Sequence, residues 1–197
     1  MSRTPLSRML AEQEAKPDAL GAFRIARRRF LAGDRVEMQE LASELGVSRA
    51  TVFRWVGSRD DLLVEIIWSI TDPTFRSALE QTTDLTGGRR VAAVMGAFAE
   101  ATIASPPFMG FVQREPERAL RLLTTKATWF QGRLIDFIEK LIGAEIEAGH
   151  LVPPLPLHDL AYITTRMTET FVYADVVAGE TPDPDKVRLV VGALLRD

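Results

Sequence analysis

The sequence predicts an all-α protein, and three observations support that prediction. Apolar residues recur at three- and four-residue spacing along most of the 197 residues, which places them on one face of a helix. Glycine and proline interrupt this pattern at intervals, as they do where helices begin and end. No segment shows the alternating pattern of a β-strand.

Composition narrows the class of protein further. A hydrophobic content of 46% is enough for one substantial core or two small ones. The absence of cysteine excludes disulfides and thiolate metal sites, and nothing in the sequence indicates a cofactor. Because no apolar run is long enough for a membrane helix or a signal peptide, we expect a cytoplasmic protein that does not enter the membrane.

The net charge of −3 is distributed unevenly. Residues 1–57 hold ten Lys or Arg against seven Asp or Glu, whereas the remaining residues hold 14 against 20. A basic N-terminal part on an acidic body is typical of a nucleic-acid-binding module joined to a separate sensing or assembly domain, although ordinary scatter of charge is the alternative.

The first elements are an arm and a helix. Residues 1–17 lack a periodic pattern and end in proline, which predicts a flexible arm whose Arg3 and Arg8 are solvated or touch DNA. Asp18 is placed to cap a helix that buries Phe23 and Phe30 and ends at Gly33.

The segment 36–59 predicts two short helices joined by a tight turn. Leu41 and Leu45 give the first helix its apolar face, and Gly46 ends it. Ser48 is placed to cap the next helix, residues 49–56. That helix buries a narrow stripe and leaves four side chains facing outward: Arg49, Thr51, Arg54 and Trp55. Such a helix suits the DNA major groove, so we predict a helix-turn-helix.

The helix that follows connects this unit to the rest of the chain. Ser58 and Asp61 form the pattern of a capping box, and an amphipathic helix then extends to about Leu79, with Pro73 as a potential bend. We therefore predict a three-helix DNA-binding domain over residues 18–64 and a helical ligand-binding and dimerisation domain over residues 65–197.

Helical patterns fill the second domain. We expect helices over 89–104, 108–114, from 116, over 127–148, 157–178 and 185–195. The helix over 157–178 and the last helix carry apolar residues on more than one face, which indicates burial on more than one side. A two-fold homodimer interface through residues 157–178 and 184–195 is the prediction, and packing within one chain is the alternative.

The helix-turn-helix segment resembles the N-terminal signature of TetR-family transcriptional regulators. The resemblance spans about 45 residues and rests on these groups: Leu41-Ala42, Leu45-Gly46-Val47-Ser48, Thr51-Val52-Phe53, Gly57-Ser58-Arg59 and Leu62-Leu63. The stretch from Phe53 to Arg59, with its tryptophan, is similar to the QsdR-like subgroup.

The resemblance implies a homodimeric repressor that a small molecule releases from a palindromic operator. It places these residues at the DNA: Gln39, Ser48, Arg49, Thr51, Phe53, Arg54, Trp55 and Arg59. Arg49 is the candidate for reading guanine, and Arg59 for contacting a phosphate. Glu37 stands where the family usually has a hydroxyl cap, and Phe53 where it often has tyrosine.

The same resemblance implies a ligand cavity in the body, and for the QsdR-like subgroup a lactone-type or fatty-acyl ligand. The candidate residues are aromatic, methionine or polar side chains on apolar helices: Met95, Phe98, Phe108, Phe111, Trp129, Phe130, Arg133, Phe137, Arg166, Met167, Thr170 and Phe171. Glu169 and Tyr173 belong to the same helices. An aromatic stripe at helical spacing also suits an ordinary core.

Two other functions remain as alternatives. A helix-turn-helix regulator that binds no ligand would show the same sequence pattern. An enzyme lacks the usual components, since the chain has two histidines and no glycine-rich phosphate loop. Glu139 and Glu145 are read as solvated helix charges, and we therefore expect no enzyme.

Overall fold

The computed structural model describes residues 17–196, and these residues form helices and loops without a β-strand. Residues 1–16 and 197 lie outside the described residues, and with them the predicted arm and its Arg3 and Arg8. The all-α prediction is confirmed.

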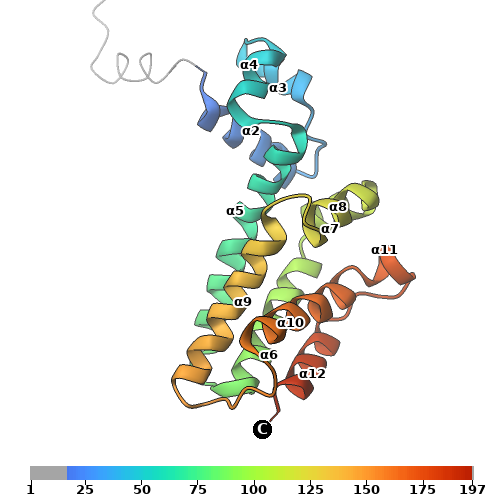
Figure 1. The fold of residues 1–197 in the computed structure, drawn as a ribbon. Helices are drawn as coiled ribbons and strands as arrows, with labels where there is room; N and C mark the ends of the chain where they lie inside the picture. Colours follow the sequence, from blue (N-terminus) through green and yellow to red (C-terminus); the bar gives the residue numbers. More distant parts are fainter. Residues whose placement is uncertain (1–16, 197) are drawn as a thin grey trace, which may run out of the picture.

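Three short helices form a head at one end of the molecule (Figure 1). They are α2 (Ala19–Leu31), α3 (Met38–Leu45) and α4 (Arg49–Val56). Asp18 caps α2 as predicted, because its carboxylate accepts a hydrogen bond from the Gly21 N–H at 2.6 Å. Arg29 braces α2 against α3, donating to Glu40 at 2.6 Å and to Glu44 at 2.7 Å.

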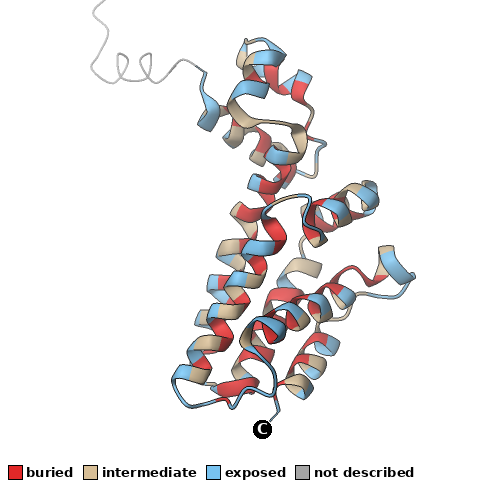
Figure 2. Cartoon of the chain, viewed as in Figure 1, coloured by how far each residue is buried: buried red, intermediate tan, exposed pale blue. Residues whose placement is uncertain are grey.

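The helix α5 (Arg59–Glu80) leads from the head into the body, and buried residues continue along it through both parts (Figure 2). The predicted capping box is present: Ser58 accepts from the Asp61 N–H, and Asp61 accepts from the Ser58 N–H. The helix contains Pro73 without ending there. Because α5 crosses the predicted boundary at residue 64, it is shared by the head and the body.

The body packs further helices around α5. They are α6 (Gly87–Ile103), α7 (Pro106–Arg114), α8 (Pro116–Thr124), α9 (Phe130–Glu147), α10 (Leu157–Val172), α11 (Ala174–Ala178) and α12 (Pro184–Leu194). The predicted single helix over 157–178 is wrong, since it breaks at Tyr173. The Phe171 carbonyl accepts from the Asp183 N–H instead of continuing the helix, and the buried Tyr173 side chain turns inward.

Small residues let α6 and α12 approach each other closely. Gly88, Ala92 and Gly96 recur every four residues along α6 and face α12. A Cβ on Gly88 would clash with the Leu195 carbonyl oxygen, and one on Gly96 would clash with the Arg188 side chain. These small residues therefore allow the backbones of α6 and α12 to come into direct contact.

Glu145 is not a solvated helix charge, contrary to the expectation from sequence. It is 2% exposed and accepts from the Gly87 N–H and from Arg90 Nη1, each at 2.7 Å. These hydrogen bonds hold the pKa of the Glu145 carboxyl below its usual range despite the opposing effect of burial. The residue joins the end of α9 to the start of α6.

No single helix among the described residues is long and apolar enough to cross a membrane. Only α6 and α7 taken together reach that length and composition, and they are bent by 71° at the break between them.

We expect Gly88→Ala to destabilise the protein by about 1–3 kcal/mol, because the added methyl group overpacks the α6–α12 contact. Gly132→Ala, on the open surface of α9 with no atom near the new methyl group, is the control and should be neutral or stabilise by up to about 1 kcal/mol. Urea unfolding followed by circular dichroism measures both. Equal stability of Gly88→Ala and the wild type would contradict the described packing.

Candidate nucleic-acid interface and interior cavity

The turn between α3 and α4 has the geometry predicted for a helix-turn-helix. Gly46 takes φ +65°, a left-handed conformation, and its N–H bonds the Ala42 and Ser43 carbonyls at the end of α3. Ser48 Oγ then accepts from the Thr51 N–H at 3.1 Å and starts α4. Glu37 makes no side-chain cap for α3 and instead lies 2.7 Å from Arg35.

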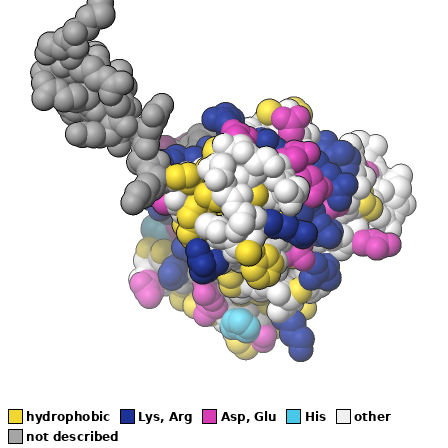
Figure 3. All heavy atoms as spheres, turned by 90° about the horizontal axis from the view of Figure 1, so that it is seen from above, with side chains coloured by type: hydrophobic (Ala, Val, Ile, Leu, Met, Phe, Trp, Pro, Cys, Tyr) yellow, Lys and Arg dark blue, Asp and Glu magenta, His cyan; other side chains and the backbone are white. Residues whose placement is uncertain are grey.

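Helix α4 buries one side chain completely and presents others at the end of the head. Val52 is fully buried, whereas Arg49, Phe53 and Arg54 are exposed, as is Gln39 on α3. Figure 3 views this end of the molecule, where basic and apolar side chains lie beside one another. Among residues 17–196, neither Arg49 nor Arg54 forms an ion pair, so both guanidinium groups are available to an anionic ligand.

The two hydroxyls at the start of α4 are also placed for an acceptor. Ser48 Oγ and Thr51 Oγ1 lie 2.9 Å apart and share one hydrogen bond. Each hydroxyl carries one proton, so one O–H remains free to donate, whichever side chain donates within the pair. A phosphate oxygen at the N-terminus of α4 would meet this donor together with free backbone N–H groups.

The structure gives two of the predicted DNA contacts partners within the chain. Trp55 is half-buried and packs against the core of the head, lining a shallow groove with Leu20, Phe23 and Val56. It follows Val52 by one helical turn and therefore lies toward α2 and α5. These apolar contacts hold α4 against the rest of the head.

Arg59 does not point outward to a phosphate. Its Nε donates to the Val36 carbonyl at 2.6 Å, and its two Nη atoms donate to the Glu115 carboxylate at 2.7 and 2.6 Å. Both side chains are largely buried, with 13% and 15% exposed. Arg59 therefore connects the head to the junction of α7 and α8. Its hydrogen bonds also hold the pKa of Glu115 below its usual range, although burial opposes them.

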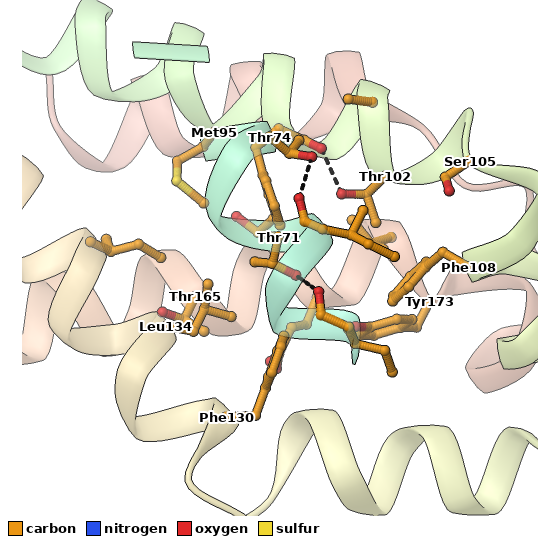
Figure 4. A pocket seen from close by; sticks show the side chains of 18 residues that line it. Thr71, Thr74, Met95, Thr102, Ser105, Phe108, Phe130, Leu134, Thr165 and Tyr173 are labelled. Carbon is orange, nitrogen blue, oxygen red and sulfur yellow. Dashed lines mark hydrogen bonds between the residues drawn. The ribbon is translucent and has the colours of Figure 1, made fainter. Parts of the chain in front are cut away.

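The body encloses a cavity of about 50 Å³ between α5, α6, α9 and α10 (Figure 4). Four of the predicted ligand residues line it: Met95, Phe98, Phe108 and Phe130. Tyr173, and Glu169 on α10, also line it. The volume holds one or two waters and is far below the roughly 300–1,000 Å³ of a typical ligand site.

The other eight predicted ligand residues lie elsewhere, and four of them pack against other aromatic rings. Phe111 packs on Phe30 of the head at 5.9 Å, and Phe137 on Phe75 at 4.3 Å. Arg133 lies over the rings of Trp68 and Trp129 at 4.6 and 5.3 Å. The remaining four belong to exposed or half-buried positions on α10: Arg166, Met167, Thr170 and Phe171.

Five threonines also line the cavity and were not among the predicted ligand residues. They are Thr71, Thr74, Thr102, Thr165 and Thr168. Threonine on the apolar face of a helix is the available signal, since a hydroxyl in a buried position needs a partner. Thr71, within the apolar run of α5, shows that signal most clearly.

Among the described residues that line the cavity, Glu169 is the one with a carboxyl group. It is 7% exposed, Arg166 Nη1 lies 2.7 Å from Oε2, and neither oxygen accepts a hydrogen bond of regular geometry among the described residues. Burial raises the pKa of Glu169 to about 7, while Arg166 and Gln131 act in the opposite direction. The body thus holds a carboxyl that keeps its proton to a much higher pH than an ordinary glutamate does.

The family model for the tetracyclin repressor-like C-terminal domain matches residues 86–196, more than half of the chain. The chain belongs to the TetR family. The structure of the R. erythropolis transcriptional repressor QsdR is 25% identical, covers 90% of this chain and 93% of its own, and superimposes with a TM-score of 0.80. The family prediction and its QsdR-like placement are confirmed.

Two further TetR-family structures show the same fold at lower identity. One is from Rhodococcus sp., 17% identical over 89% of this chain and 93% of its own, and the other from Shewanella sp. PV-4, 18% identical over 89% and 94%; each has a TM-score of 0.50. No curated protein matches the chain.

We expect the raised pKa of Glu169 to make the protein less stable as pH rises. Between the ordinary pKa of 4.5 and about 7, the native state binds the proton more tightly than the unfolded state, so the free energy of unfolding falls across that window. The full shift corresponds to about 3 kcal/mol. Urea unfolding of the wild type and of Glu169→Gln at several pH values measures the effect.

The difference between the two proteins isolates this carboxyl, because Glu115 and Glu145 titrate identically in both. Glu169→Gln should gain stability relative to the wild type as pH rises from 4.5 to about 7. A difference that stays constant with pH would show that Glu169 ionises normally.

Proposed function

We propose that this chain is a homodimeric transcriptional repressor that a small, mostly apolar molecule releases from a palindromic operator. Residues 18–64 form its DNA-binding domain, and residues 65–197 bind the ligand and form the dimer. The protein acts in the cytoplasm, binds no membrane and needs no cofactor. Family membership and the exposed face of α4 support this function over catalysis.

The observation that carries the proposal is the outer face of α4. Arg49 and Arg54 are exposed and form no ion pair with any residue from 17 to 196, and Phe53 is 56% exposed although it is aromatic. Arg49 is suited to bidentate contact with guanine, and Phe53 to the methyl group of thymine. Ser48, Thr51 and Gln39 lie around these residues and serve as phosphate or base contacts.

Exposed apolar side chains on α10 and α12 support the dimer. Tyr162 is 49% exposed and Leu189 is 71% exposed, while Ile163 and Met167 of α10 are half-buried. A second copy related by a two-fold axis would cover these residues. It would also place two copies of α4 on successive turns of the major groove, about 34 Å apart.

Release follows from where the cavity lies. Because the enclosed volume is too small for a ligand, an occupant must move the cavity walls apart. Ile67, Ile70, Thr71 and Thr74 of α5 form one wall, and the same helix continues to the head. A displacement of α5 therefore changes the separation of the two α4 helices and lowers operator affinity.

We expect Arg49→Ala to weaken operator binding by about 10- to 100-fold per half-site, because a bidentate guanine contact contributes about 1–3 kcal/mol. The operator is first selected from random DNA duplexes with the wild-type protein, and binding is then measured by fluorescence anisotropy. Arg89→Ala on the body makes the same change of charge and serves as the control. Wild-type affinity of the Arg49→Ala protein would contradict the assigned reading helix.

We expect a dimer in light scattering, and a monomer for Leu189→Glu, since a carboxylate in an apolar interface is not compensated. Val152→Glu changes an even more exposed residue, in the loop between α9 and α10, and should remain dimeric. A monomeric wild type at micromolar concentration would remove the two-fold arrangement from the proposal.

A further inference from the structure

The threonine hydroxyls in the cavity wall can accept hydrogen bonds from a bound molecule, but they have no proton left to donate to it. Each hydroxyl donates its proton to the carbonyl four residues earlier in its own helix, at distances of 2.7–2.9 Å. The bonds of Thr71, Thr74 and Thr102 are visible in Figure 4. With its proton used in this way, a hydroxyl presents only oxygen lone pairs to the cavity.

Glu169 adds a carboxylate to the same wall. Its oxygens are fully buried and accept no hydrogen bond of regular geometry among the described residues, although Gln131 lies close enough to lower its pKa. Arg166 Nη1 lies 2.7 Å from Oε2 and comes from an exposed position on α10, so the cation beside Glu169 does not belong to the cavity lining. A buried carboxylate without hydrogen bonds is unfavourable, and a donor inside the cavity would remove that cost.

Among the described residues, no positively charged side chain lines the cavity to offset these acceptors. The 18 residues that line the cavity, all in the described part of the chain, include no Lys, Arg or His. The other polar residues in the wall are Ser105 and Tyr173, whose hydroxyls both donate and accept. The faces of the phenylalanine rings are themselves attractive to cations. The interior therefore combines apolar walls with an excess of negative partial charge.

We propose that the cavity selects an apolar molecule with one protonated amine, and that Glu169 binds this ammonium group. The inference rests on the proposed function, because it names the chemistry of the ligand for that same site. A fatty carboxylate would bring a second negative charge to Glu169, and a lactone or acyl ester would bring further acceptors to a wall in which acceptors outnumber donors. An alkylammonium instead supplies up to three N–H donors.

The test compares three probes with the same alkyl chain: octylamine, octanoate and octanol. Isothermal titration calorimetry at about pH 8, where Glu169 is ionised and the amine is protonated, measures their affinity for the wild-type dimer. We expect octylamine to bind more tightly than octanol, and octanoate to bind most weakly. Equal or tighter binding of octanoate would overturn the proposal.

Glu169→Gln keeps the shape of the side chain and removes its charge. It should weaken octylamine binding by about 10- to 100-fold, the range for a hydrogen bond to a charged group, and leave octanol within a few-fold. Glu80→Gln, on the exposed side of α5, is the matched control. Unchanged octylamine affinity in Glu169→Gln would overturn the assignment. If that variant does not fold, the wild-type ranking of the three probes decides.

Ligand binding and operator release are measured separately, so the two proposals fail separately. Octylamine that binds without lowering operator affinity would contradict the proposed release and leave the amine site intact. A protein that binds its operator but no amine would retain its proposed regulatory role and contradict the amine site alone.

Discussion

The hydrogen bonds of Arg59 join the two parts of the molecule. This side chain lies at the first residue of α5 and binds the Val36 carbonyl before α3 and the Glu115 carboxylate between α7 and α8. A planar guanidinium meeting both carboxylate oxygens has little freedom to slide or rotate. This partly buried ion pair therefore restrains the position of the head relative to the body, and Asp60 with Arg121 repeats the connection nearer the surface.

Because of this junction, α5 can transmit a displacement from the cavity to the head. The helix is held at its start by Arg59, forms the cavity wall near its middle and contains Pro73 just beyond. A proline removes one backbone hydrogen bond of the helix, and the helix bends most easily near it. A displacement of Ile67, Ile70 or Thr71 would therefore move the head, because the part of α5 before Pro73 bends less easily. The packing of Phe30 on Phe111 gives the head a further contact with α7. The head would turn about this contact.

Local chemistry explains which features the sequence predicted. The caps at Asp18, Ser48 and Ser58 depend on residues within one helical turn, so spacing alone identified them. Arg59 and Glu145 were misassigned because their partners, Glu115 and Arg90, are 56 and 55 residues away. Periodicity shows that a helix face is buried without showing what covers it, so Phe98 in the cavity wall and Phe137 in the core looked the same.

Glu169 shows why a site can be unfavourable for stability and still suit its ligand. A core built for stability alone would place an apolar residue there, since burial without hydrogen bonds raises the pKa of Glu169 to about 7. The cavity around it is also too small to hold a solvating shell. Both features lower the stability of the body at the cavity wall, which α5 forms in part. A ligand that donates hydrogen bonds to Glu169 would recover this free energy on binding. Because it must also open the cavity, its binding would displace the helix that leads to the head.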